Sequence, residues 1–531
     1  MNKIGFKNFR KFQEFPMLTL GNLTLLVGGN NAGKSTFVKA ALLIYNFLHT
    51  QIGDITKSSI FGSVTPEMNF DVTEPFDVHI GTFARAKRRQ AKDDEPIEFT
   101  FEIEGFEIAA HVNGLLINGA IDNDSASGII SYLSIKDIVN KVVYSIDYTT
   151  HRMFVEFENK DYHNTNDDND NVSTLSEQNE KDEIEQQLKN ERNFAKIIEL
   201  KKRLVELNKK VTPVKANYSE EYKLELPLSD FSDSPSDYYL TNVIRSFIEY
   251  SRLDTPSTLA KNSKEYKIDV ENKAVLKSNI FKMEDGKRRL SFAISLTDME
   301  YIYAHAARQV VFFNSKDKND YMAQTIHEFT TSKAIYDTKV QEFINTWMTE
   351  FNIGNSFKIK NHGGEAYEVF VHDTEGESNL ADMGMGSIQL MILLFKLGTY
   401  MKQYGQREFP PLILIEEPEQ NIHPILQSKL AELFMRLNQQ MNFRFIIETH
   451  SEYLVRHCQV LAAKQLYEEN ISLEDVNNSI KVYYFSQERG PVDMLFMDNA
   501  KFQESFDEGF FDQAARESLI ISRLERIHKR K

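Results

Sequence analysis

The sequence contains one cysteine, Cys458, in 531 residues, and this excludes a disulfide framework and a metal site made of several cysteines. It also lacks any apolar run near the 18 or so residues that a membrane-spanning helix needs. The N-terminus has no charged-then-apolar pattern of a signal peptide, since residues 18–27 are interrupted by Gly21 and Asn22. We therefore expect a cytoplasmic protein with no membrane partner.

Positive charge is scarce as well: 62 Lys and Arg face 78 Asp and Glu, a formal net charge of −16. Such a chain is a poor general binder of nucleic acid, because phosphate contacts need clustered cations. Local basic runs are more often solvated faces than nucleic-acid contacts. These runs are Arg85, Lys87, Arg88, Arg89 and Lys92, then Lys282, Lys287, Arg288 and Arg289, then residues 528–531. Nucleic-acid binding is therefore left open, without support from the net charge.

A glycine-rich loop stands out near the N-terminus. Residues 28–35 read Gly-Gly-Asn-Asn-Ala-Gly-Lys-Ser, with an apolar strand-like run before them and helically spaced apolar residues after them. In that context the loop amides and the helix N-terminus bind phosphate, Lys34 reaches the β- and γ-phosphates, and Ser35 ligates Mg²⁺. The predicted nucleotide-binding residues are Gly28, Asn30, Asn31, Ala32, Gly33, Lys34, Ser35 and Thr36.

About 380 residues later an apolar strand, residues 412–415, ends in two carboxylates, Glu416 and Glu417. Its continuous apolar character is typical of a strand buried on both faces, and ligands bind at the carboxyl ends of such strands. We expect Glu416, which stands where most such enzymes have Asp, to hold Mg²⁺ directly or through water. We expect Glu417 to orient or deprotonate the attacking water. The alternative is a solvated acidic cap on a strand.

Two more segments carry polar groups next to predicted elements. Gly384 and Gly386 precede an apolar helical pattern, and this second phosphate cradle is best explained if it closes over a nucleotide held by another subunit. Standing alone, it would be a plain turn before a core helix. A second buried-type strand, residues 443–447, leads into Glu-Thr-His-Ser, where His450 can donate to a γ-phosphate or to water. Taken alone, His450 is more often structural.

This order of motifs resembles the ATP-binding-cassette (ABC) type ATPases of the SMC, RecF and OLD group. Residues 4–12 look like the first strand of those heads, and residues 506–511 look like their C-terminal tail. The likeness covers about residues 1–50 and 375–520. It is greatest to stand-alone ATPases of bacterial antiphage systems, such as PtuA of Septu and the ATPases of some retrons.

The resemblance implies an α/β fold: a P-loop ATPase head whose mixed sheet has an antiparallel N-terminal lobe, with a large, mostly helical insertion. It implies ATP and Mg²⁺ as ligands, Glu417 and His450 as catalytic residues, and Ser35 and Glu416 at the metal. It also implies a homodimer, open to further assembly, whose signature acts in trans through Asp382, Gly384, Gly386 and Gln389. Ser387 is the candidate to replace a serine that the family often has beside the first signature glycine. His79 occupies about the place of the Q-loop glutamine.

The chain divides into three predicted regions: residues 1–158, the N-terminal lobe with the P-loop; 159–355, the insertion; and 356–531, the C-terminal lobe. Alternating patterns predict antiparallel strands within residues 96–158 and a hairpin over 356–372 that turns at Gly363 and Gly364. The apolar spacing predicts a charged helix over residues 182–209, which is too short for a long SMC arm, and mostly helix over residues 235–351.

These features lead to two competing functions. The favoured one is a molecular switch that dimerises around ATP and controls a separate effector, a nuclease, in antiphage defence. The alternative is a RecF-like ATPase for DNA repair or DNA-end binding. Only 80 residues follow Ser451, with no Asp-x-Asp at a strand end, so we expect no nuclease in this chain.

Overall fold

The computed structural model describes residues 1–52, 67–72, 76, 78–117, 120–122, 124–150, 152–158, 221–227, 264–303, 308–313, 320–405, 407, 409 and 411–528. The helix expected over residues 182–209, the first part (235–263) of the region expected to be mostly helix, and the last three basic residues lie outside these ranges. None of the helices that the structure describes combines the length and the apolar character needed to cross a lipid bilayer.

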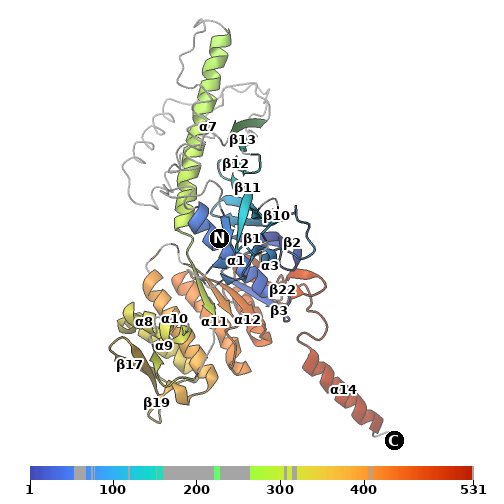
Figure 1. Ribbon diagram of the computed structural model, residues 1–531. Coiled ribbons are helices and arrows are strands. Elements are labelled where there is room, and N and C mark those ends of the chain that lie inside the picture. Colours follow the sequence, from blue (N-terminus) through green and yellow to red (C-terminus); the bar gives the residue numbers. More distant parts are fainter. Residues whose placement is uncertain are drawn as a thin grey trace.

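A large antiparallel sheet forms the upper part of the molecule (Figure 1). Within the described ranges its order is β14-β13-β12-β11-β8-β7-β1-β2, with β4 added beside β11. Side chains of β7 and β8 alternate between buried and partly exposed, so one face packs on a core. This confirms the antiparallel strands predicted within residues 96–158. The strands are β1 (Lys3–Phe9), β2 (Phe12–Thr19), β4 (Glu67–Asn69), β7 (Ile97–Ile103), β8 (Phe106–Gly114), β11 (Ser127–Asp137), β12 (Val142–Asp147), β13 (Arg152–Glu158) and β14 (Glu221–Pro227).

A second sheet of largely parallel strands lies below it, in the order β15-β20-β21-β3-β22-β23. β23 alone of these described strands runs antiparallel to its neighbour. Each residue of β3 is buried, as expected for a strand covered on both faces. The strands are β3 (Leu23–Gly28), β15 (Met299–Tyr303), β20 (Leu412–Glu416), β21 (Arg444–Thr449), β22 (Ile480–Ser486) and β23 (Gly490–Asp493).

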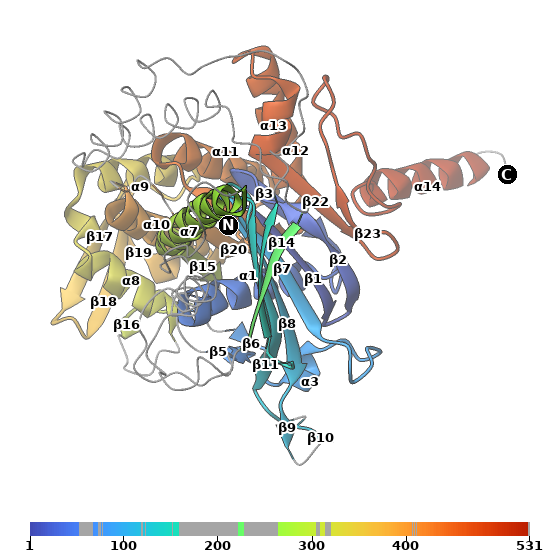
Figure 2. The same cartoon turned by 90° about the horizontal axis from the view of Figure 1, so that it is seen from above.

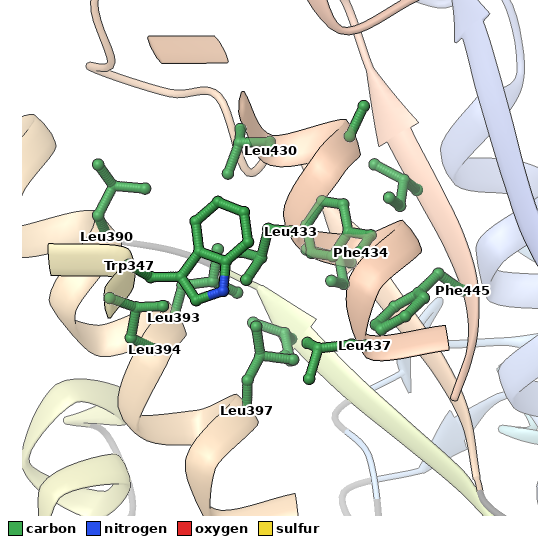
Figure 3. Close-up of a cluster of buried hydrophobic side chains, with 14 of the residues drawn as sticks. Trp347, Leu390, Leu393, Leu394, Leu397, Leu430, Leu433, Phe434, Leu437 and Phe445 are labelled. Atoms are coloured by element: carbon green, nitrogen blue, oxygen red, sulfur yellow. The ribbon is translucent and has the colours of Figure 1, made fainter. Parts of the chain in front are cut away.

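Alternate residues of β3 contribute to two separate cores. Leu26 packs with α1 (Lys34–Phe47) and the antiparallel sheet, whereas Leu25 and Val27 face the helical layer on the other side. That layer contains α8 (Tyr321–Thr331), α9 (Thr338–Glu350), α10 (Met385–Tyr404), α11 (Pro424–Met441) and α12 (Glu452–Tyr467). Figure 3 shows part of this core, in which Trp347 lies among leucines of α10 and α11. The parallel sheet is therefore covered on both faces.

The helical layer also holds the predicted hairpin. β17 (Ser356–His362) pairs with β18 (Ala366–His372), and Gly363 and Gly364 both adopt positive φ at the turn, which confirms the prediction. β16 (Phe312–Phe313) and β19 (Glu377–Asn379) pair with opposite ends of β18, along the edge that β17 does not occupy. α14 (Gln513–His528) projects away from the body at the C-terminus, as Figures 1 and 2 agree.

The prediction of mostly helix over residues 235–351 missed β15. This strand has only five residues, and it pairs in parallel with β20, more than a hundred residues further along the chain. A short strand of this kind has no helical or alternating repeat long enough to detect, and its partner is not local. The boundary proposed at residue 355 would therefore separate one edge of the parallel sheet from the rest of it.

A long helix, α7 (Lys264–Ser295), stands against the antiparallel sheet and is held there by Arg289. The Arg289 guanidinium pairs with the fully buried carboxylate of Asp137 and donates to Asp285 Oδ2 at 3.0 Å. Asp137 also accepts bonds from the backbone of Val139 and Asn140. Arg289 is therefore a half-buried anchor for α7, and the expectation of a solvated basic face for this cluster is wrong at this position.

Arg289→Ala is expected to lower the free energy of unfolding by about 3 kcal/mol, because it leaves the Asp137 charge buried with backbone donors as its main partners. Urea unfolding followed by circular dichroism measures this change. Arg288→Ala is the matched control, since Arg288 is exposed on the same turn of α7. Equal midpoints for the two variants would show that the buried pair contributes little.

Candidate active site

The glycine-rich loop joins the end of β3 to the start of α1. Gly33 adopts φ of 111°, and a Cβ there would lie 2.4 Å from the Phe12 ring, so both the backbone and the space require glycine. The Lys34 side chain is only 3% exposed, and its ammonium donates to the carbonyls of Gly28 at 3.0 Å and Gly29 at 3.2 Å. Burial lowers the pKa of Lys34, and the carboxylates of Glu448 and Glu417 oppose that shift.

The carboxyl ends of β20, β21 and β3 meet at one edge of the parallel sheet, as the sequence predicted. Register pairs Glu416 with Glu448 and Glu448 with Leu26. Glu417 follows β20 with φ of 42°, a left-handed conformation that is uncommon for a residue with a side chain and often marks a functional turn. Its amide donates to the Glu448 carbonyl at 2.8 Å, which fixes the turn against β21.

His450 lies between the loop lysine and Glu417. Its Nε2 atom is 3.1 Å from Lys34 Nζ and 3.4 Å from Glu417 Oε1. Burial, followed by the charge of Lys34, lowers the pKa of His450, so the neutral ring is favoured. Glu419 holds this segment in place, because its Oε1 atom accepts from the His450 amide at 2.6 Å and from the Thr449 hydroxyl at 2.7 Å. The structure therefore brings together three side chains that sequence reasoning had selected separately.

Glu448 is a site residue that the sequence reasoning missed. It is 4% exposed, and its Oε1 atom accepts from the Ser35 hydroxyl at 2.8 Å and lies 3.8 Å from Lys34 Nζ. Burial raises the pKa of Glu448 to about 7, and the charges of Glu416 and Glu417 act in the same direction. The sequence signal that could have identified it is a carboxylate at the second-last position of a largely apolar strand, two residues before His450.

Glu416 was expected to lie beside Ser35, but its carboxylate contacts Tyr301. The Tyr301 hydroxyl on β15 faces the Glu416 carboxylate; burial raises the pKa of Tyr301, and the charge and hydrogen bond of Glu416 add to that rise. Among the described residues that line the cavity around the glycine-rich loop, the carboxylates are those of Glu417 and Glu448. The predicted pairing of Ser35 with Glu416 at a metal stays a prediction, while the contact that Ser35 makes is with Glu448.

The cavity around the loop has a volume of about 1110 Å³ and a strongly basic wall. Arg10 and Lys11 line it from the turn between β1 and β2. Four further cations line it from α3 (Phe83–Ala86) and the residues that follow: Arg85, Lys87, Arg88 and Arg89. Burial lowers the pKa of Arg10, and the charge of Arg85 lowers it further. Arg85 and Arg89 are exposed, as expected for a solvated face, and the run also shares a cavity with the glycine-rich loop.

The predicted signature lies away from this cavity within the same chain. Gly384 is the N-cap of α10, and both it and Asp382 are exposed. Gly386 packs so closely on the next segment that a Cβ would lie 2.5 Å from the Asn421 carbonyl oxygen. Gln389 is 2% exposed, and neither of its amide atoms has a hydrogen-bond partner in the described structure. A contact with a second chain is therefore expected from Asp382, Gly384 and the first turn of α10, and not from Gln389.

His79, the candidate for the Q-loop position, is not among the described residues that line the cavity. Its side chain is 71% exposed, and its Nδ1 atom lies 2.5 Å from Asp71 Oδ1 across a short strand pair. The structure therefore gives no contact between His79 and the loop residues.

Comparisons with known proteins complete the description of the site. A family model described as "AAA ATPase domain" matches residues 1–455, a span that includes both the loop and the Glu-Thr-His-Ser segment. A search of curated proteins finds no match.

Among solved structures, the chain is similar to the Smc head domain from Pyrococcus furiosus with an extended coiled coil, bound to the C-terminal domain of ScpA. The identity is 13%, the match covers 93% of this chain and 96% of that one, and the TM-score is 0.31. The SMC head domain from Thermotoga maritima matches at 10% identity over 86% of this chain and 91% of that one, with a TM-score of 0.27. These are loose overlays, and the α/β architecture is established by the sheet order itself.

Proposed function

Because the chain belongs to the AAA ATPase domain family, we propose that it is an ATP-hydrolysing molecular switch that dimerises around ATP and controls a separate effector in antiphage defence. The observation that carries the proposal is the convergence of Lys34, Glu417 and His450 on one basic cavity. A triphosphate needs cations and backbone amides, and its hydrolysis needs a base for water; this cavity supplies both.

The residues divide the chemistry among them. Lys34 and the loop amides hold the phosphates, and the basic wall adds charge at the cavity mouth. Glu417 accepts the proton of the attacking water, and the neutral imidazole of His450 donates a hydrogen bond to the γ-phosphate. The Ser35 hydroxyl and a buried carboxylate form an oxygen donor set that suits Mg²⁺, which would neutralise charge on the phosphate oxygens when bound.

A second copy of the chain is required because the signature lies away from the cavity of its own subunit. Exposed Asp382 and Gly384 at the start of α10 present amides and a helix N-terminus outward, where they can meet a phosphate held by another chain. Closure of two subunits would then complete two sites, and hydrolysis would release them. Light scattering with a nonhydrolysable ATP analogue, which keeps the sites closed, tests this: the mass should double from 61.5 kDa when the analogue is added, and an unchanged mass would contradict the switch.

The defence role is supported by the motif order, which resembles the stand-alone antiphage ATPases. A phage challenge tests it in cells that carry the gene with its native neighbours. We expect protection from phage with the intact gene and its loss with Lys34→Ala. Equal plating efficiency with and without the intact gene would remove the defence role while leaving the ATPase assignment untouched.

The basic wall favours a second candidate function, a RecF-like ATPase that binds DNA ends. Arg85, Arg88 and Arg89 lie beside the phosphate loop without a carboxylate partner among the described residues. If they contact a DNA backbone, DNA will stimulate ATP hydrolysis, the stimulation will fall steeply with salt, and an Arg88→Ala, Arg89→Ala double variant will lose it. If DNA does not stimulate hydrolysis at low salt, the RecF-like function is contradicted and the molecular switch remains.

A further inference from the structure

We propose that Glu448, rather than Glu416, is the carboxylate that completes the Mg²⁺ site of this chain together with Ser35. The inference rests on the proposed ATPase function and specifies how that site binds its metal. It departs from the expectation drawn from the sequence, which assigned this role to the carboxylate at the end of the acidic strand.

The first argument is the position of each carboxylate relative to the loop. β21 lies directly beside β3, whereas β20 is one strand further away. Neighbouring strands are about 4.8 Å apart, so Glu416 starts one strand spacing further from the loop than Glu448 does. The Ser35 hydroxyl accordingly donates to Glu448 at 2.8 Å.

The second argument is an oxygen that lacks a partner. Glu448 is 4% exposed, and its Oε2 atom makes no hydrogen bond in the described structure. A buried carboxylate oxygen without a donor is unfavourable, and such exceptions commonly mark a place for an ion or water. Lys34 relieves the charge only partly, since its ammonium is 3.8 Å from the other oxygen and makes shorter contacts with loop carbonyls.

The third argument is the environment of Glu416. Its carboxylate is opposite the Tyr301 hydroxyl, on the side of β20 away from β3 in the strand order. A glutamate facing this tyrosine keeps a negative charge near the site without occupying the position beside Ser35. Tyr301 of β15 therefore holds the Glu416 carboxylate on the side of β20 that faces away from the loop.

Mg²⁺ needs only one or two carboxylates, because phosphate oxygens and water complete its octahedral shell. Ser35 and Glu448 meet that requirement: when the Ser35 hydroxyl turns from Glu448 to the cation, both oxygens of Glu448 become available to the metal or to its bound water.

The experiment compares the binding of a fluorescent ATP analogue in Mg²⁺ and in EDTA for the full-length chain. For Glu448→Gln we expect affinity in EDTA to stay the same and the gain from Mg²⁺ to fall about tenfold or more, the loss typical of metal-site partners. Mn²⁺ electron paramagnetic resonance in the presence of nucleotide should show the same loss. Glu432→Gln, at a half-buried residue of α11 paired with Arg436, is the matched control.

Glu416→Gln decides between the two carboxylates. A smaller loss for Glu416→Gln than for Glu448→Gln supports the proposal, and an equal or larger loss overturns it. If Glu448→Gln fails to fold, Glu448→Asp keeps the charge with one methylene less reach; it should weaken Mn²⁺ binding, and unchanged Mn²⁺ binding would overturn the proposal. Absence of nucleotide binding by the wild-type chain in either buffer would instead refute the proposed ATPase function.

Discussion

Lys34→Ala is expected to abolish nucleotide binding, with a loss of at least a hundredfold in affinity. The Lys34 ammonium is buried beneath the loop, where its contacts are carbonyls, His450 and carboxylates, and it is placed to follow the β- and γ-phosphates. Hydrogen bonds to charged groups contribute about 1.5–3 kcal/mol each, so the loss of two such bonds accounts for the expected change.

Isothermal calorimetry with ATP and Mg²⁺ measures this loss. Lys34→Met is a useful second variant, because it keeps most of the buried aliphatic volume and removes only the charge. Lys339→Ala, at an exposed position in the first turn of α9, is the matched control and should bind as the wild type does. Retained affinity in both Lys34 variants would mean that the loop does not hold the nucleotide.

Glu417→Gln is expected to trap an ATP-bound dimer and to slow hydrolysis by about a hundredfold to ten-thousandfold, the range that a general base contributes. Glutamine keeps the length of the side chain, and the strained backbone at this position already accommodates a residue of that size. It cannot accept a proton from water, so the closed state should persist.

Light scattering with ATP should give a mass near twice 61.5 kDa for Glu417→Gln, and the Lys34→Ala, Glu417→Gln double variant should remain at the mass of one chain. Glu432→Gln controls for the loss of one negative charge elsewhere on the surface. A Glu417→Gln protein whose mass is the same with and without ATP would rule out the sandwich mechanism, whatever its rate of hydrolysis.

Local patterns were sufficient for the elements that carry the phosphate loop and the two acidic strands. The strand before Gly28, the helix after Gly33 and the apolar run before Glu416 all form where their periodicity indicates. The hairpin at Gly363 and Gly364 forms for the same reason, because a glycine turn between alternating strands is encoded within a few residues. In each case the physical cause lies within one window of sequence.

Other features depend on contacts between residues that lie far apart in the sequence, and local patterns do not predict such contacts. β15 became a strand because β20 offers it a parallel partner far along the chain. The basic run after α3 became part of the cavity because the antiparallel sheet brings it beside the loop. Arg289 of α7 does not lie on the solvated face expected for it, because it pairs with the buried carboxylate of Asp137 on β11.

The sequence by itself determined the strand, turn or helix that carries each motif, and from these it predicted that Lys34, Glu417 and His450 act on a bound nucleotide. Only the tertiary structure decided which carboxylate meets Ser35. Glu416 and Glu448 both end apolar strands, and the sequence does not distinguish their distances from the loop. The strand order does, because hydrogen bonding between strands places β21, and therefore Glu448, directly beside β3.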